Sequence, residues 1–161
     1  RDRFDLLDAP SEIGENIFIV TQIKQVEAVT HFNQGLSIEK DREFVPDTFL
    51  HELFVIILEN SKLNIFTGCG HSNVLNMLRM TKKIFPDYPI KSLFGGFHLK
   101  KPEKYSVEEQ ILIREIASKL ENYNIEKIYT NHCTGLAGFD LLKEVLGEKI
   151  EYFGLGSSAE I

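Results

Sequence analysis

The sequence has few cysteines, no surplus of positive charge and no long apolar run. Only two of its 161 residues are cysteine, too few for a disulfide scaffold. Asp and Glu number 24 against 18 Lys and Arg, which argues against nucleic acid as a partner because phosphate binding needs a basic surface. The longest apolar stretch, Leu53 to Leu58, is far shorter than a membrane span. No signal peptide is recognisable, so we expect a cytoplasmic protein that does not act at a membrane.

Apolar residues make up 43% of the chain, enough to build the core of one domain. We interpret residues 1–161 as a single domain of mixed α/β class. The first third reads as strands over 17–23 and 26–31, a turn over 10–14 and a loop over 33–48. Alternation of strands and helices then predicts strands at 53–58, 63–67, 90–94, 126–130 and 150–153, and helices at 74–85, 106–120 and 136–146.

Three of the five histidines follow directly after predicted strands, in loops that contain glycine. They are His71, His98 and His132. Because the carboxyl ends of strands in an α/β sheet meet at one edge, the three loops are expected to converge. Neutral imidazole is a common zinc ligand and also binds iron. A single histidine beside a glycine is more often a loop or capping residue, but the repetition at three strand ends predicts a metal site.

Other residues of the same loops offer further chemistry. The helix start at Thr134 and Gly135 is a candidate cradle for a substrate anion, because free backbone N–H groups gather at helix N-termini. Cys69 and Cys133 could ligate a metal as thiolates, or pack as small apolar residues behind their histidines. Packing is the favoured interpretation, and a disulfide between them is not expected in a reducing compartment.

Two histidines and two carboxylates lie outside these loops. His31 and His51 are interpreted as surface or boundary residues. Asp47 and Glu52 precede a buried strand and could support the site from behind the ligands, although a solvated position is the simpler interpretation.

The three loops, in this order, resemble the metallo-β-lactamase superfamily. Residues 67–71 (TGCGH), 95–99 (GGFHL) and 131–135 (NHCTG) look like successive signatures of its dihydropterin–ribofuranosylaminobenzene phosphate synthase-like branch. The likeness implies an αββα sandwich with one or two zinc ions, or iron or manganese, at its edge. By position it implies that His71 serves the first metal and His132 the second, while His98 falls where the superfamily usually has a bridging aspartate.

The His-x-His-x-Asp-His motif that defines the superfamily is absent from this sequence. The chain therefore resembles only the C-terminal half of the sandwich, a mixed sheet with helices on one face. The resemblance implies a metal-dependent hydrolase of a phosphoester or similar small anionic substrate, for which this chain supplies the C-terminal ligands. A non-catalytic half-domain that binds a ligand or associates is the second reading, and a small anion- or nucleotide-binding domain the third. A half sandwich leaves one sheet face for the N-terminal half or a second copy to cover.

Overall fold

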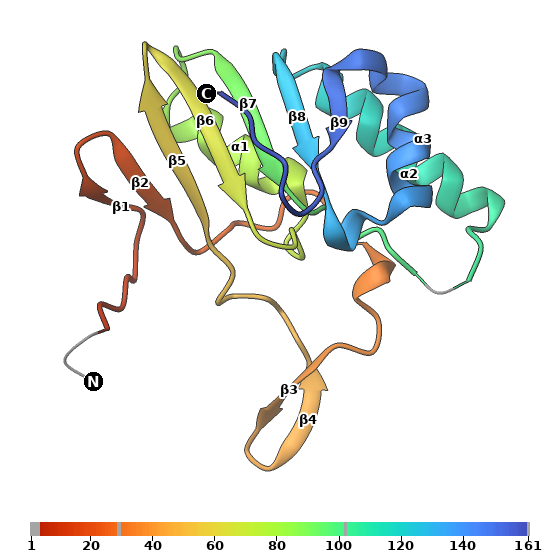
Figure 1. Cartoon of the computed structure of the whole chain (residues 1–161). Coiled ribbons are helices and arrows are strands. Elements are labelled where there is room, and N and C mark those ends of the chain that lie inside the picture. Colours follow the sequence, from red (N-terminus) through yellow and green to blue (C-terminus); the bar gives the residue numbers. More distant parts are fainter. Residues whose placement is uncertain (1–3, 29, 102, 161) are drawn as a thin grey trace.

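A computed structural model describes residues 4–28, 30–101 and 103–160 of the chain. A seven-stranded mixed sheet carries three α-helices on one face (Figure 1). The strand order is β1-β2-β5-β6-β7-β8-β9, with antiparallel pairing up to β6 and parallel pairing beyond it. The strands are β1 Ser11–Gly14, β2 Ile17–Val20, β3 Ser37–Lys40, β4 Glu43–Pro46, β5 Phe54–Glu59, β6 Lys62–Thr67, β7 Ile90–Gly95, β8 Lys127–Thr130 and β9 Ile150–Tyr152. The helices are α1 Val74–Ile84, α2 Val107–Glu121 and α3 Leu136–Leu146, with short 3-10 turns η1 His31–Asn33, η2 His132–Thr134 and η3 Gly147–Lys149.

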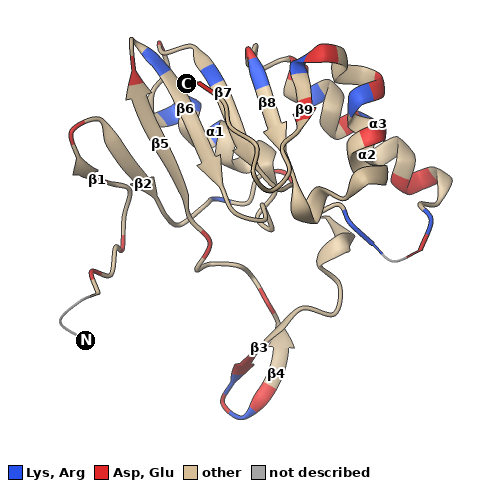
Figure 2. Cartoon of the chain, viewed as in Figure 1, with Lys and Arg blue, Asp and Glu red and all other residues tan. Residues whose placement is uncertain are grey.

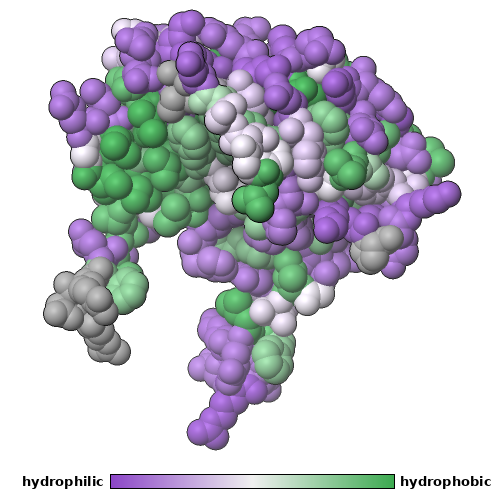
Figure 3. All heavy atoms as spheres, in the orientation of Figure 1, coloured by the Kyte–Doolittle hydropathy of each residue, from purple (hydrophilic) through white to green (hydrophobic). Residues whose placement is uncertain are grey.

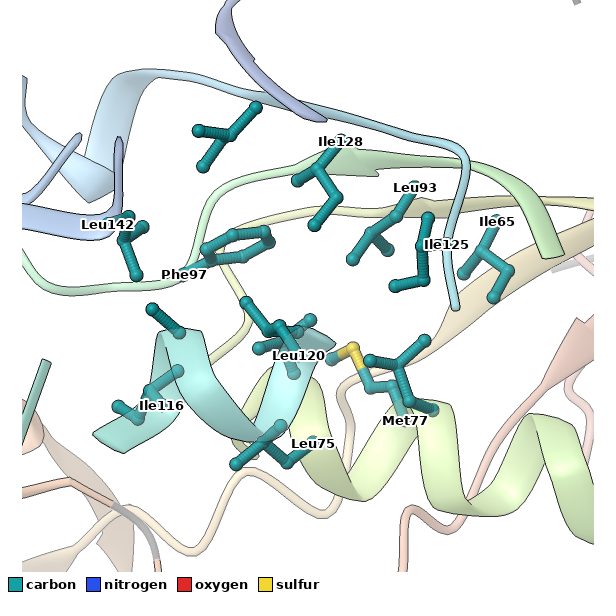
Figure 4. Packing of buried hydrophobic residues seen from close by; sticks show 14 of the residues in the cluster. Ile65, Leu75, Met77, Leu93, Phe97, Ile116, Leu120, Ile125, Ile128 and Leu142 are labelled. Carbon is teal, nitrogen blue, oxygen red and sulfur yellow. The ribbon is translucent and has the colours of Figure 1, made fainter. Parts of the chain in front are cut away.

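The core lies between the sheet and its helices. Alternate residues of β5 and β6, such as Phe54, Ile56 and Ile65, are fully buried on the helix side. Met77 of α1 and Leu120 of α2 approach the same layer from the helices (Figure 4). This alternation is what a strand with one face against helices requires, and it fixes the register of β5 against β6.

The other face of the sheet is apolar and only partly covered. Val55 and Ile57 of β5 alternate with the buried residues and pair across the ladder with Ile19 and Ile17 of β2. Figure 3 shows hydrophobic residues gathered on this face over β2 and β5. Farther along the sheet, the rings of Phe66, Phe94 and Tyr129 stack in a row, with centroids 4.9 and 4.5 Å apart.

The predicted order of strands and helices from residue 53 onward is confirmed, as is the mixed sheet with helices on one face. Three expectations for the first third are wrong. The predicted turn at 10–14 contains β1, and no strand forms among the described residues of 26–31. There the Val26 and Glu27 N–H groups both donate to the Asn76 side chain, 2.9 and 2.8 Å away, instead of to a neighbouring strand.

The predicted loop over 33–48 contains the hairpin β3–β4, which projects away from the main sheet (Figure 1). Its two central residues, Asp41 and Arg42, both have positive φ, +53° and +69°. Two successive left-handed residues make a tight hairpin turn whose twist matches the strands. That turn is usually built with Asn-Gly or Asp-Gly, so Asp-Arg gave no hairpin signal.

Helix α2 begins with a capping box. Ser106 Oγ accepts a hydrogen bond from the Glu109 N–H, and the Glu109 carboxylate accepts one from the Ser106 N–H. Glu109 is also paired with Lys101 at 2.8 Å and with His31 at 3.0 Å. The Lys101 and His31 partners, together with the Ser106 N–H, lower the pKa of Glu109 to about 2.

Glu109 is therefore expected to stabilise the fold through its charge. A lowered carboxylate pKa means that the unfolded chain takes up protons first, so this stabilisation is present above pH 4.5 and is lost as the pH falls toward 2. The melting temperature of Glu109→Gln should be below that of the parent at pH 7, and the gap should close in acid. Glu115→Gln on the exposed side of the same helix is the control, and a pH-independent gap for Glu109→Gln would contradict the prediction.

Candidate metal centre

The loops that follow β6, β7 and β8 pack backbone against backbone at the carboxyl ends of these parallel strands. The Gly96 N–H donates to the Gly68 carbonyl at 2.8 Å, and the Leu99 N–H donates to the Cys133 carbonyl at 3.0 Å. A Cβ on Gly70, which has φ +74°, would lie 2.5 Å from the Gly96 carbonyl oxygen. The glycines flanking the histidines therefore allow the loops to approach this closely.

His71 is held on three sides. Its N–H and that of Ser72 donate to the two carboxylate oxygens of Glu52, at 2.8 and 2.6 Å. The Phe49 ring stacks flat on the imidazole, with centroids 4.4 Å apart and planes 2° from parallel. Asn33 closes the third side, with its Nδ2 donating to the His71 carbonyl and its Oδ1 lying 2.9 Å from His71 Nδ1.

His98 lies directly beside His71, with ring centroids 4.0 Å apart. Its Nε2 is 3.2 Å from the Phe32 carbonyl oxygen. Its Nδ1 is buried and has no hydrogen-bond partner among the described residues. The backbone at His98 is left-handed, with φ +43°, a conformation that costs a non-glycine residue of order 1 kcal/mol or more and that is concentrated at functional sites.

The hydrogen bonds fix which nitrogen of each ring is free. A carbonyl oxygen only accepts, so His98 Nε2 carries the proton toward Phe32 and Nδ1 keeps its lone pair. Asn33 Nδ2 donates to a carbonyl, so its Oδ1 accepts from His71 Nδ1, and Nε2 of His71 keeps the lone pair. Each imidazole thus has one anchored N–H and one bare nitrogen, the arrangement found in histidines that ligate metals.

Burial also keeps both rings neutral. It lowers the pKa of His71, against the opposing effect of the Glu52 and Asp47 carboxylates. It lowers the pKa of His98 too, and the adjacent His71 adds to this. Neutral imidazole is the form that binds a cation.

The loop of His132 packs against the loop of His98, but the His132 side chain is not part of the histidine pair. His132 is exposed, has φ +40° and lines a neighbouring cleft together with Gly135. Thr134 is fully buried, and its hydroxyl accepts from the Phe97 N–H at 2.9 Å and bonds to Thr130 at 2.6 Å. The structure therefore brings His71 and His98 together, places His132 at the rim, and uses the Thr134 hydroxyl to tie the loops.

Both cysteines are free thiols. Cys133 is buried, packs against Gly96 and donates to the Cys69 carbonyl at 3.2 Å. Burial, with a contribution from Cys69, raises the pKa of Cys133 to about 12, so its thiol stays protonated at neutral pH. The packing interpretation fits this environment better than a thiolate ligand.

The interpretation of Glu52 as a solvated residue is wrong, because its carboxylate binds two backbone N–H groups of the His71 loop. Asp47 accepts from the Phe49 N–H at 2.7 Å and so shapes the turn that presents Phe49 to His71. His51 is exposed, and His31 pairs with Glu109, outside this site.

Asn33, Phe32 and Phe49 were not foreseen as site residues. They come from segments without periodicity, and a backbone carbonyl such as that of Phe32 has no sequence signature. The only sequence feature that they share is their position before a hairpin, since Phe32 and Asn33 precede β3–β4 and Phe49 precedes β5–β6.

The two bare imidazole nitrogens are suitable metal ligands, but two ligands are fewer than a metal site needs. Within residues 4–28, 30–101 and 103–160, no group of three or more His, Cys, Asp or Glu side chains is arranged to hold one. A catalytic zinc normally keeps three protein ligands and a water. Further ligands would have to come from a movement of His132 or from outside the described residues.

Comparison with solved structures identifies the class of protein that this fold resembles. A crystal structure described as a metal-dependent hydrolase of the β-lactamase superfamily matches it with a TM-score of 0.77 and 25% identity, over 97% of this chain and 57% of that one. The predicted fold class is thereby confirmed.

Among curated proteins, the chain is 25% identical over 157 residues to the 7,8-dihydropterin-6-methyl-4-(beta-D-ribofuranosyl)-aminobenzene-5'-phosphate synthase of Methanocaldococcus jannaschii. The match covers 96% of this chain and 51% of that protein, so the chain spans about half the length of its relative. The predicted resemblance is confirmed by both comparisons. No protein-family model matches, and no helix of the described residues is long and apolar enough to cross a membrane.

Replacing Asn33 tests whether its side chain fixes the orientation of the His71 ring. Asn33→Ala should weaken metal binding about 10- to 100-fold, because His71 loses the partner that fixes its tautomer and ring position. Isothermal titration with Co²⁺ in a protein with a complete ligand set would measure this. Gln34→Ala, at the exposed neighbouring position, should leave the affinity unchanged, and an equal effect of both substitutions would contradict the assigned role.

Proposed function

We propose that the chain is the C-terminal half of a metal-dependent hydrolase that acts on a phosphoester or a similar small anionic substrate. The observation that supports this most strongly is the pair of adjacent neutral imidazoles, His71 and His98, each with one anchored N–H and one bare nitrogen. The similarity to a structure described as a metal-dependent hydrolase supports the same class of chemistry.

In this proposal His71 Nε2 and His98 Nδ1 hold the ion, with His132 as a third candidate from the adjoining loop. Imidazole nitrogen suits zinc, and iron or manganese are the alternatives, with one or two ions in the complete site. A bound ion of this kind polarises the phosphoryl oxygen and lowers the pKa of a bound water toward ~7. The chain's own part is to fix the two nitrogens through Asn33 and the Phe32 carbonyl, and to keep both rings neutral by burial.

We also propose that an N-terminal half completes both the ligand set and the core. The open face of the sheet carries Ile17, Ile19, Val55 and Ile57, and a sheet must bury its apolar face to be stable. A half of similar size, which the relative has outside the match, could cover this face and add ligands. A second copy of this chain could cover the face but would bring the same ligands.

A fusion tests the proposal. The part of the archaeal relative outside the match is joined to this chain, and metal content and hydrolysis of bis(4-nitrophenyl) phosphate are measured. We expect about one or more ions per fusion, with turnover, and little metal in the chain alone. The same fusion with His71→Ala and His98→Ala should lose both.

A fusion that folds, as judged by circular dichroism, but holds no metal would overturn the proposal. A stable dimer of the chain alone, without metal or turnover, would instead support the second reading, a non-catalytic half that associates through its open face.

A further inference from the structure

One excursion of the chain, residues 32–52, supplies the groups that support the two paired histidines. It lies between β2 and β5 and contains the β3–β4 hairpin, and we call it the strap. The arm before the hairpin brings the Phe32 carbonyl and the Asn33 side chain to the pair. The arm after the hairpin brings the Phe49 ring and the Glu52 carboxylate. The histidines are therefore held from both arms of the same segment.

The β3–β4 hairpin joins the two arms of the strap. It forms a two-stranded sheet of its own, separate from the main sheet. At its root the Asp47 N–H donates to the Leu36 carbonyl at 3.0 Å, and at its tip Asp41 and Arg42 form the left-handed turn. Because the hairpin pairs one arm with the other, loss of its pairing would let the arms separate.

Little of the strap is buried. Among residues 32–52, all of which the structure describes, Phe49 alone is buried, with 5% of its surface exposed. The hairpin tip carries charges of both signs and points away from the main sheet (Figure 2). A two-stranded hairpin by itself is only marginally stable in water. Segments with few buried apolar contacts open locally while the rest of a domain stays folded.

Phe49 holds its closed position with a strained backbone. Its φ is +53°, a left-handed conformation that a bulky residue rarely adopts. The Phe49 N–H donates to Asp47 at 2.7 Å, the ring stacks on His71, and the preceding Thr48 carbonyl accepts from Gln25 Nε2 at 2.9 Å. Such strain persists only where surrounding contacts enforce it, and it is concentrated at ligand clamps and switch regions. Loss of these contacts would let Phe49 relax away from the histidine.

Two backbone amides can report whether the strap is closed. The N–H groups of His71 and Ser72 donate to the Glu52 carboxylate at 2.8 and 2.6 Å, so their acceptor lies on the strap. When that arm lifts, both amides become free to exchange with water. The Asn73 N–H donates to the Gly70 carbonyl at 3.1 Å, within the histidine loop itself, and keeps its acceptor when the strap opens.

We propose that the strap opens and closes over the paired histidines as one unit, and that the pairing of the β3–β4 hairpin controls its closure. In the closed state His71 is anchored by Asn33, Phe49 and Glu52, and opening removes all three contacts together. That opening admits and releases the ion is a consequence that rests on the proposed function, whereas the opening itself needs no metal.

Amide hydrogen exchange in the full chain, measured by ¹H–¹⁵N NMR in EDTA, tests the proposal. Asp41→Asn combined with Arg42→Gly gives the turn the Asn-Gly pair that suits two left-handed residues, and it should slow exchange at His71 and Ser72 about fivefold. Arg42→Pro should speed exchange at both amides by a similar factor, because proline cannot adopt the φ of +69° found there. Exchange at Asn73 should follow neither change.

Ser61→Gly is the matched control, because Asn60 and Ser61 form the equivalent turn of the β5–β6 hairpin, with φ +49° and +61°. It should leave exchange at His71 and Ser72 unchanged, and melting curves verify that each variant is folded. Equal slowing by Ser61→Gly would overturn the proposal. So would an Asn-Gly turn that slows exchange within the β3–β4 hairpin and at neither of the two amides.

Failure of the proposed function gives a different result. The two amides could follow the hairpin turn while the fusion with the archaeal segment takes up no metal, which would leave the strap standing and remove the proposed function. A fusion that takes up metal, in a chain whose His71 and Ser72 amides do not respond to the hairpin turn, would do the reverse.

Discussion

Replacing Gly96 by alanine is expected to lower the free energy of unfolding by about 3 kcal/mol, because overpacking between fixed backbones leaves little room to relax. A Cβ at this position would overlap the Cys133 sulfur and would lie 3.4 Å from the Gly68 carbonyl oxygen and 3.5 Å from the Cys69 Cα. All three histidine loops meet at this point. Urea denaturation, with the midpoint and slope fitted together, measures the loss.

Gly68→Ala is the matched control, since nothing lies within 4 Å of a Cβ there. Combining Gly96→Ala with Cys133→Ala should recover much of the stability, because the sulfur is the atom most nearly overlapped. If Gly96→Ala and Gly68→Ala unfold at the same urea concentration, the loops do not pack as closely as described.

Loss of either paired histidine is expected to weaken metal binding by more than about 100-fold in a protein with a complete ligand set, because a ligand is removed outright rather than misoriented. His71→Ala and His98→Ala are the substitutions, and Co²⁺ titration followed by visible absorption is the measurement. His51→Ala is the control, since the His51 side chain is 71% exposed. Unchanged affinity in His98→Ala would restrict the site to His71 and ligands from elsewhere.

The elements from residue 53 onward were predictable because their signals are local. Helix α2 has a capping box and apolar residues at helical spacing, and the β5–β6 hairpin has two apolar strands around a polar turn. The first third was less predictable because part of its backbone forms hydrogen bonds with side chains of other elements and not with a neighbouring strand. The backbone at Val26 and Glu27 bonds to a side chain of α1, and the turn of β3–β4 uses two residues that rarely signal a hairpin.

The convergence of the histidine loops was predictable, whereas the residues that surround His71 were not. The rule that strand ends meet at one edge brought His71 and His98 together correctly. It could not say that the His132 ring would lie at the rim, since that depends on side-chain direction within a 3-10 turn. Asn33 and Phe49 reach His71 from 38 and 22 residues away in sequence, and contacts of that range leave no pattern in the chain.

The most direct test of the account is the tautomer of each paired histidine. Long-range ¹H–¹⁵N NMR spectra of the metal-free chain at pH 7 should show His71 protonated on Nδ1 and His98 protonated on Nε2. In the protein with a complete ligand set, added Zn²⁺ should then shift His71 Nε2 and His98 Nδ1, the two bare nitrogens. Reversed tautomers, or zinc that shifts neither nitrogen, would contradict the claim that this pair is built to hold a metal.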